Sequence, residues 1–366
     1  MPTSVRPGIL ARLARRSLRI LLVPIGLLAL FLAGAWVTGC LLSGPGYRGP
    51  VSDHFDGQRF INQLPIRHRS FNEFLRWMRK REPAPWHWIE AKPGPPPPER
   101  VDHGRLRVTF VNHATVLIQM DGLNVLTDPI WSQRASPFSW IGPRRMRPPG
   151  IRFADLPPID VVLLSHNHYD HFDTPTLRRL EAAHHPRFVT GLGNGSLLAK
   201  LGIDEHRIDE RDWWEITKLG DGRRLHVVPA QHFSARGLCD RDKALWVGFV
   251  LEGPSGRVYF AGDTGFGPHF RQIRKRLGAP RLALLPIGAY RPEWFMARVH
   301  ISPAEAVRAH HLLGAHTSIG IHFGTFRLAD DGQTEPLETL ARVLANHPTP
   351  RPQFWTLNFG EGREIP

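Results

Sequence analysis

Cysteine is scarce in this chain: among 366 residues, only Cys40 and Cys239 carry a thiol. Two thiols are too few for a disulfide framework, and their positions do not fit a thiolate zinc site. Any metal ion must therefore be held by histidine and carboxylate side chains.

The sequence also lacks the features of a nucleic-acid-binding protein. The net charge is +14, but no basic run interleaved with aromatic residues, zinc-finger spacing or RNA-binding signature is present. Five of the positive charges are arginines of the first 39 residues, which contain no acidic residue. The remaining excess fits an anionic membrane surface, an anionic substrate or ordinary surface solvation. We expect no nucleic acid partner.

The N-terminal leader combines these arginines with a long apolar run. Residues 20–37 are apolar except for one proline and two glycines, which is typical of a signal sequence or a short membrane-spanning helix. The following Val37-Thr38-Gly39-Cys40 resembles the lipobox of bacterial lipoproteins, so we expect lipidation of Cys40. An uncleaved spanning anchor and a buried free cysteine are the alternatives. With a lipid or a spanning anchor, the body would face the periplasm of a bacterial cell envelope.

Composition divides the chain into three parts: a signal or anchor (1–40), a proline-rich lead-in (41–104) and a main domain (105–366). The lead-in contains a predicted helix at Phe71–Lys80 and a polyproline linker or strap at residues 92–98. In the main domain, strands in two sets with helices outside predict an αββα sandwich. The predicted strands are Leu106–Val111, Thr115–Met120, Asn124–Thr127, Val161–Ser165, Arg187–Thr190, Leu225–Pro229, Leu245–Leu251, Val258–Ala261, Leu282–Pro286 and Ser318–His322. The predicted helices are Pro175–His184 and Pro303–Leu313, the second with Ser302 as N-cap and Glu305 three residues later.

The strongest functional signal is a cluster of ligand-type side chains directly after a predicted strand. His166, His168, Asp170 and His171 follow the apolar Leu163 and Leu164 within a few residues. Unpaired imidazoles and a carboxylate at the end of a buried strand are costly to desolvate, and a metal ion removes that cost. His166 and His168 can face one ion, while Asp170 and His171 can face a second.

Three further candidate ligands, His232, Asp263 and His322, each follow another apolar run. Together the seven side chains complete a site for two ions. Three histidines hold one ion, an aspartate and two histidines hold the other, and Asp263 lies between them. Nitrogen and oxygen ligands without thiolates suit zinc best, with iron or manganese as the other candidates.

The spacing His-x-His-x-Asp-His, followed by His, Asp and His, is the pattern of the metallo-β-lactamase superfamily. More specific sequence motifs around it resemble those of the N-acylphosphatidylethanolamine-hydrolysing phospholipase D family, over roughly residues 105–327. These motifs are Asn112-His113-Ala114-Thr115-Val116-Leu117, Leu126-Thr127-Asp128-Pro129-Ile130, Arg134-Ala135-Ser136-Pro137, Leu156-Pro157-Pro158-Ile159-Asp160, Asp212-Trp213-Trp214-Glu215, Ile287-Gly288-Ala289-Tyr290 and His322-Phe323-Gly324-Thr325-Phe326.

The resemblance implies a metallo-β-lactamase αββα sandwich with two zinc ions. It implies a phosphodiesterase whose bridging hydroxide attacks a membrane phospholipid, releasing an N-acylethanolamine and phosphatidic acid. Two departures concern substrate specificity: Asn112 stands where glycine is usual, and Arg291-Pro292-Glu293 reverses the charges expected after Tyr290. The implied ligands are His166, His168 and His232 for one zinc, Asp170, His171 and His322 for the other, and Asp263 as the bridge.

Further roles are expected around the ligands. Asp170 would orient the attacking water or take its proton, and a protonated His300 or a metal-bound water would serve the leaving group. Asp128 would fix a metal-ligating histidine or cap the turn before its proline. Tyr290 and Arg291 would border the substrate. His113 would pack beneath the sheet or, less favoured, border the site.

Two other functions remain open at this stage. A lactonase, thioesterase or β-lactamase that attacks a carbonyl could use the same site, because one fold hosts many chemistries. A non-catalytic envelope lipoprotein with a structural metal is disfavoured. Structural zinc sites are usually closed four-ligand cages, whereas this set of ligands leaves room for water.

Overall fold

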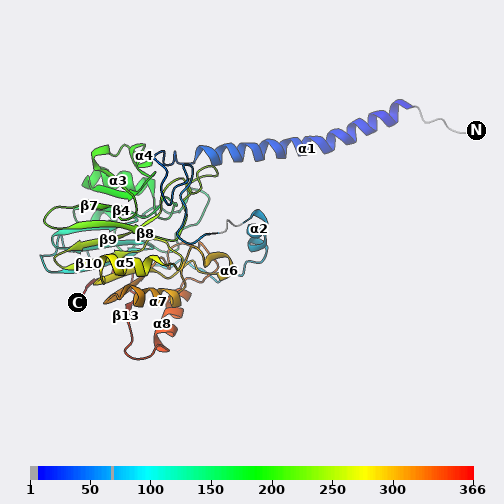
Figure 1. Ribbon diagram of the computed structural model, residues 1–366. Helices are drawn as coiled ribbons and strands as arrows, with labels where there is room; N and C mark the ends of the chain where they lie inside the picture. Colours follow the sequence, from blue (N-terminus) through cyan, green and yellow to red (C-terminus); the bar gives the residue numbers. More distant parts are fainter. Residues whose placement is uncertain (1–6, 67–69) are drawn as a thin grey trace, which may run out of the picture.

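Two seven-stranded sheets face one another in the main domain, and helices cover the outer face of each (Figure 1). The structure, a computed structural model, describes residues 7–66 and 70–366. This arrangement confirms the predicted αββα sandwich. In the first sheet the strand order is β14-β1-β2-β3-β4-β5-β6, with bounds β1 Leu106–Asn112, β2 Thr115–Met120, β3 Leu123–Thr127, β4 Val161–Leu164, β5 Arg187–Gly191, β6 Ile208–Arg211 and β14 Gly362–Glu364. In the second the order is β13-β12-β11-β10-β9-β8-β7, with bounds β7 Ile216–Lys218, β8 Arg224–Pro229, β9 Val247–Gly253, β10 Gly256–Phe260, β11 Leu282–Pro286, β12 Thr317–Ile321 and β13 Gln353–Trp355.

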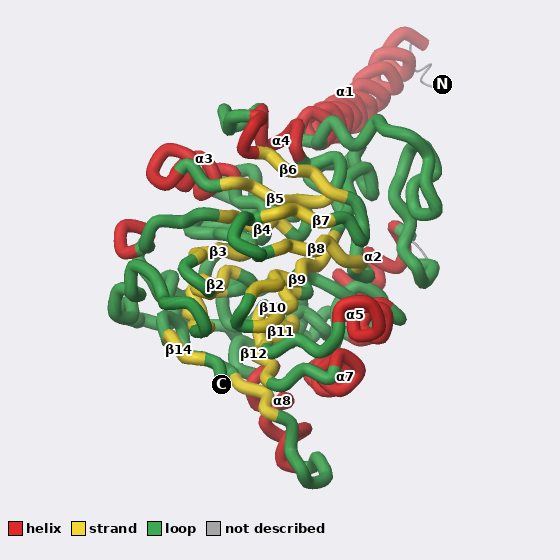
Figure 2. The backbone as a smooth tube through the Cα atoms, turned by 60° about the vertical axis from the view of Figure 1, so that its left-hand side comes forward, coloured by secondary structure: helices red, strands yellow, loops and turns green. Residues whose placement is uncertain are grey.

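The helices form the outer layers, and local sequence signals fix their ends. At α7, Ser302 accepts a hydrogen bond from the Glu305 N–H while the Glu305 side chain caps Ser302 in return, which is the predicted capping box. In Figure 2, α5 and α7 lie beside the second sheet and α3 and α4 beside the first. The helix bounds are α1 Pro7–Leu41, α2 Phe71–Arg79, α3 Thr174–His184, α4 Gly195–Ala199, α5 His269–Leu277, α6 Glu293–Met296, α7 Pro303–Leu313 and α8 Glu335–Ala345, with 3-10 turns at Phe153–Asp155 and Glu205–Arg207.

All ten predicted strands of the main domain occur, with ends shifted by up to two residues. The strands absent from the prediction are short or polar. Strand β6 reads Ile-Asp-Glu-Arg, and β7, β13 and β14 contain three residues each. Such segments carry no alternating apolar pattern, so only their pairing with neighbouring strands identifies them.

The leader forms the long helix α1, which projects away from the body (Figure 1). Within the described residues, Val23–Leu41 is the one stretch long and apolar enough to cross a membrane, with a mean hydropathy of 1.9 and none of it buried. Helix α1 continues through Cys40, whose sulfur forms a disulfide with Cys239. That sulfur is neither free nor open to acylation in this state, so the structure differs from both the lipidated and the free-thiol expectation for Cys40.

The lead-in, residues 41–104, lies against the main domain over much of its length. Phe55 and Phe60 are buried in the main core. At the end of the polyproline segment, the carbonyl groups of Pro98 and Glu99 accept hydrogen bonds from Gln119 and Asn124. Residues 92–98 therefore act as a strap along the body, one of the two roles expected for them.

Candidate metal centre

Strand direction explains why the candidate ligands meet. Strands β3, β4 and β5 are mutually parallel. In the second sheet β10, β11 and β12 are parallel, and β8 runs the same way because both β8 and β10 are antiparallel to β9. The carboxyl ends of such strands lie at one edge of each sheet. The residues that follow them therefore converge: Asp128, His166, His232, Asp263 and His322.

Three histidines form the first candidate metal position. His166 Nε2 lies 2.9 Å from His168 Nδ1, and His232 Nε2 lies 3.3 Å from the same His168 atom. Burial, the largest cause, lowers the pKa of His168 to about 4 and holds the pKa values of His166 and His232 well below their ordinary value. All three rings are thus neutral at pH 7, the state in which imidazole binds a metal ion.

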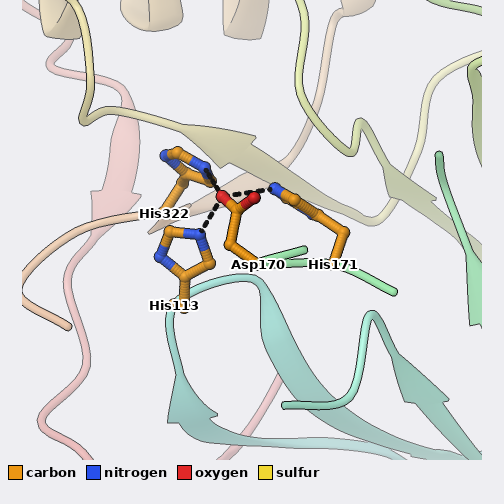
Figure 3. A group of neighbouring side chains, drawn as sticks. All are labelled: His113, Asp170, His171 and His322. Carbon is orange, nitrogen blue, oxygen red and sulfur yellow. Dashed lines mark hydrogen bonds and ion pairs between the residues drawn. The ribbon is translucent and has the colours of Figure 1, made fainter. Parts of the chain in front are cut away.

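A second group surrounds Asp170 (Figure 3). The Asp170 Oδ2 atom lies 3.0 Å from His113 Nε2, 3.2 Å from His171 Nε2 and 3.5 Å from His322 Nε2. Burial by itself would raise the pKa of Asp170, but the charge of His171 and contacts with the other histidines hold it well below its usual value. The carboxylate is therefore ionised in a buried setting.

Asp263 lies between the two groups, as expected for a bridging ligand. Its Oδ1 atom is 3.1 Å from His322 Nε2, and its Oδ2 atom is 3.2 Å from His171 Nε2 and 3.8 Å from His232 Nε2. Burial again opposes ionisation, yet the charges of His171 and His322 keep the pKa of Asp263 well below its usual value. One carboxylate thus faces both candidate positions.

The donor atoms fit metal ions better than they fit one another. Within the described chain, the buried atoms His171 Nε2, Asp263 Oδ1 and His322 Nε2 have no hydrogen-bond partner of acceptable geometry. Buried polar atoms are rarely left so, because each costs about 1–3 kcal/mol. Two ions would supply the missing partners and would balance the buried carboxylates. Nitrogen and oxygen donors fit zinc, iron or manganese, and the residues present fit two such ions.

Asp128 holds the ring of His171 by a hydrogen bond, which is one of the two roles expected for it. Its Oδ2 atom accepts a hydrogen bond from His171 Nδ1 at 2.6 Å, and its Oδ1 atom accepts one from the Ser165 N–H at 2.7 Å. This bond fixes the ring so that His171 Nε2 points to the metal position. The structure therefore places the Asp128 carboxylate on His171 and not on the turn before Pro129.

His113 belongs to the site, although packing beneath the sheet was the favoured expectation. It follows β1, lies 2% exposed, and its Nε2 bonds to Asp170 Oδ2. Its backbone carbonyl also accepts a hydrogen bond from the His322 N–H at 2.7 Å, which joins the two sheets at the site. The signal available in the sequence was its position directly after an apolar strand, the feature shared by the other candidates.

Several residues at this edge have strained backbone conformations with positive φ angles. His113, Asp128 and His322 have φ angles of 47°, 32° and 63°, a region that costs a residue other than glycine about 1–3 kcal/mol. Gly262, at φ 58°, precedes Asp263 where an added Cβ would stand 2.5 Å from the Cβ of Ser165. The surrounding packing holds these conformations, and they aim the side chains into the site.

A cavity of about 420 Å³ opens above the candidate ligands. Its floor includes His168, Asp170 and Asp263. The remaining lining is largely apolar and includes three guanidinium groups, none of which was expected at the site from the sequence. These lining residues are Arg59, Ile66, Phe233, Arg241, Phe295, Met296, Arg298, Val299 and Leu328.

His300 also lines this cavity, with its Nδ1 atom 3.8 Å from Asp263 Oδ2. Burial is the largest cause that lowers its pKa, to about 4. The ring is neutral at pH 7, so the structure differs from the expectation of a protonated His300. A neutral ring can still donate one hydrogen bond to a substrate oxygen.

Tyr290 and Arg291 do not reach this cavity. The Tyr290 hydroxyl lies 3.3 Å from Glu335 and 3.2 Å from Thr339, and Arg291 Nη1 donates to Glu335 at 2.9 Å. Both side chains therefore face α8 and join it to the loop after β11. Their expected place at the substrate came from the family resemblance, and the contact with α8 depends on a helix that was not predicted.

Comparison with known proteins agrees with the fold. The profile described as Beta-lactamase superfamily domain matches residues 123–323, more than half of the chain. An N-acyl-phosphatidylethanolamine-hydrolyzing phospholipase D 1 of Caenorhabditis elegans is 38% identical over 266 residues, covering 70% of this chain and 75% of that protein. An uncharacterized protein of Mycobacterium tuberculosis is 43% identical over 244 residues, 66% of this chain. The match spans 64% of the mycobacterial protein's length.

Among solved structures, Igni18, a metallo hydrolase of the archaeon Ignicoccus hospitalis, superposes with a TM-score of 0.53. It is 21% identical and covers 72% of this chain and 99% of its own, a likeness that concerns the fold alone. The sandwich, the cluster at its strand ends and the matched profile lead to one conclusion: the chain belongs to the metallo-β-lactamase superfamily.

Proposed function

We propose that the chain is a binuclear zinc phosphodiesterase of the phospholipase D type, acting on N-acylphosphatidylethanolamine-like phospholipids. The cavity above the candidate ligands carries this proposal. Its apolar walls suit acyl chains, and the guanidinium groups of Arg59, Arg241 and Arg298 suit an anionic phosphodiester. The Caenorhabditis elegans relative, whose name describes hydrolysis of this lipid, supports the substrate class.

The proposed ligands divide the work between two positions. His166, His168 and His232 would hold one zinc ion, and Asp170, His171 and His322 the other, with Asp263 between them. Two zinc ions bound there would lower the pKa of a water molecule toward neutrality and hold the oxygens of the group under attack.

The protein's own groups would then direct the reaction. Asp170, which is held by its hydrogen bond with His113, would orient the attacking water or accept its proton. Attack by the water oxygen would form a new bond to phosphorus and break the bond to the N-acylethanolamine oxygen. The departing oxygen would take up the proton that the water released, leaving phosphatidic acid. His300, which lines the cavity, would donate a hydrogen bond to the departing oxygen.

We also propose that helix α1 anchors the enzyme in the membrane, with the body in the periplasm. The apolar stretch Val23–Leu41 is long enough to span a bilayer, and the arginines that precede it favour the cytoplasmic side. The Cys40–Cys239 disulfide supports an oxidising compartment for the body. It also favours a retained spanning helix over the lipidated Cys40 expected from the sequence.

The test uses the full chain in detergent, with metal content measured by elemental analysis. Four substrates are compared: N-acylphosphatidylethanolamine, phosphatidylethanolamine, a chromogenic phosphodiester and a chromogenic carboxylic ester. We expect two zinc ions per chain and release of N-acylethanolamine, abolished by a chelator and restored by zinc. Ester cleavage without phosphodiester cleavage would favour the lactonase or esterase alternative. Bound metal without any turnover would favour a structural role.

A further inference from the structure

Helix α2 of the lead-in is fixed to the body by one face. Trp77 is buried, stacks on Phe295 with ring centroids 4.8 Å apart, and donates from Nε1 to Asp330 at 3.1 Å. Ser70 and Glu73 form a complete capping box at the helix start. These contacts hold α2 in a defined orientation, so the same residues of α2 always face away from the body.

That other face is apolar where a soluble helix would be polar. Phe71, Phe74 and Met78 follow the spacing i, i+3 and i+7, which places them on one side of the helix, and their exposed fractions are 71%, 42% and 47%. Exposed Arg79 and Lys80 lie beside them at the helix end. Basic residues next to a stripe of large apolar side chains are typical of helices that lie in the interface of an anionic membrane.

Helix α2 also contacts α6, which contributes to the wall of the metal cavity. Phe295 and Met296 of α6 line the cavity, and Phe295 is the ring on which Trp77 stacks. Trp294, the preceding residue, is 43% exposed, and the Arg76 guanidinium lies 5.3 Å from its ring centre. We call Phe71, Phe74, Met78, Arg79, Lys80 and Trp294 the α2–α6 surface.

The direction of α1 indicates that this surface would face a lipid bilayer. In Figures 1 and 2, α2 lies on the side of the body toward which the apolar helix α1 projects. A bilayer crossed by α1 would therefore lie on the same side as α2. The charges agree, because anionic headgroups would complement Arg79 and Lys80, and α2 contains a single acidic residue, Glu73.

We propose that the α2–α6 surface docks on an anionic lipid bilayer and opens the cavity directly to the membrane. This inference rests on the proposed function, because it assigns the membrane itself as the source of the substrate. The Phe71, Phe74 and Met78 side chains would enter the headgroup boundary while Arg79 and Lys80 contact the lipid phosphates. An acyl chain could then pass beside α6 into the cavity without crossing water.

Hydrogen–deuterium exchange of the full chain in vesicles tests this docking without any need for activity. The vesicles are phosphatidylcholine alone or phosphatidylcholine mixed with phosphatidylglycerol, and the chain in detergent is the reference. We expect slower exchange in the α2 peptide in the anionic vesicles, and unchanged exchange in α5, whose basic residues belong to another face. Equal α2 exchange in both vesicle types would overturn the anionic docking. Protection in detergent that rises with protein concentration would also overturn it, by assigning the surface to a second copy of the chain.

Two variants separate the charge from the apolar contribution. Arg79→Glu with Lys80→Glu should abolish the difference between the two vesicle types, since each basic residue favours an anionic surface about fivefold. Phe71→Ser with Phe74→Ser and Met78→Ser should remove the protection in both. Arg271→Glu with Lys275→Glu on α5 is the matched control and should behave as wild type, because both residues are exposed away from the α2–α6 surface.

Activity then distinguishes the two proposals. The α2 variants should hydrolyse lipid in vesicles about tenfold more slowly while retaining wild-type rates on a soluble chromogenic phosphodiester. Equal losses on both substrates would indicate damage to the fold and contradict a docking role. If no phosphodiester is cleaved by any form, the phospholipase proposal fails, while α2 exchange in vesicles still decides whether the surface binds membranes.

Discussion

The strand-end edge and the lead-in contribute to the same site by different means. All seven proposed ligands stand in loops that follow strands of the two sheets, whose pairing fixes their positions. The described lead-in supplies no ligand, yet it reaches the site. Its Asn62 accepts a hydrogen bond from the His232 N–H at 3.0 Å and donates one to the His232 carbonyl at 2.7 Å, and Arg59 and Ile66 line the cavity.

This difference matches the two tasks of a metal-dependent hydrolase. Ligand geometry must be held to a few tenths of an ångström, which hydrogen-bonded sheets provide. The cavity wall must suit one substrate class, and an irregular segment can supply it without disturbing the sheets. We therefore expect substitutions at the strand-end edge to abolish metal binding and catalysis. Substitutions in the lead-in should weaken the contacts that hold the ligands or lower the stability of the fold.

The largest effect is expected from Asp170→Asn at the edge. The amide keeps the shape but removes the charge that would hold the second ion and orient the nucleophile. Loss of a positioned acid–base group alone costs about 10²–10⁴-fold in rate, and loss of an ion should cost more. Zinc content, the thermal melt and phosphodiester turnover are measured together, with exposed Asp221→Asn as the control. A fully metallated, active Asp170→Asn protein would overturn the proposed site.

The disulfide, which joins the end of α1 to the main domain directly before the lead-in, provides the next largest test. Cys40 and Cys239 are 199 residues apart in sequence, so their bond restricts the unfolded chain over a long loop. Replacing both by serine should lower the free energy of unfolding by about 2–4 kcal/mol, while zinc content stays at the wild-type level. Denaturant titration of the full chain in detergent measures the change.

Intact mass checks the chemical state on which this prediction depends. The wild-type chain should retain residues before Cys40 and gain the mass of two hydrogens on reduction. A mature chain that begins at an acylated Cys40 would contradict the disulfide and restore the lipoprotein interpretation.

The same contrast explains what the sequence could predict. His166, His168 and His171 follow an apolar strand in a short, distinctive spacing, so both the strand and the cluster were predictable from residue pattern alone. Capping chemistry located α7 equally well, because Ser302 and Glu305 are local signals. Each of these predictions depends on residues that are neighbours in the sequence.

The remaining features depend on contacts between distant parts of the chain. Arg59 and Asn62 lie in a segment without periodicity, and only its packing brings them to the cavity and to His232. The pairing of Cys40 with Cys239 has no local signature. Tyr290 was expected beside the substrate because of the family resemblance. Its contact with Glu335, 45 residues later on a helix that was not predicted, has no local signal in the sequence.

An intermediate effect is expected from Asn62→Ala in the lead-in. The change removes both hydrogen bonds to the His232 backbone and one accepted from Trp246 Nε1. Lost bonds of this kind cost about 1–3 kcal/mol in stability, and a loosened ligand should weaken zinc binding about tenfold. Competition with a zinc chelator measures the affinity. Gln63→Ala, which alters the exposed neighbouring amide, should leave zinc affinity unchanged; equal effects of the two variants would show that Asn62 gives no special support.

The smallest effect is a pH dependence of stability at His54, where the lead-in contacts the loop after β6. The ring stacks on Trp213 at 4.3 Å, and its Nε2 lies 2.7 Å from Asp212 Oδ1. Burial lowers the pKa of His54, but the hydrogen bonds to Asp212 and Asp53 and their charges together raise it above its ordinary value. Because the folded pKa exceeds the unfolded one, the contribution to stability is complete below about pH 6.5 and is lost as the pH rises through the folded value. His54→Phe keeps the stacking but cannot be protonated, so the stability difference between wild type and variant should shrink from about pH 5 to about pH 8. Denaturant midpoints across this range measure the difference, and a gap that stays constant or widens with rising pH would show that the charged state of His54 does not hold the lead-in in place.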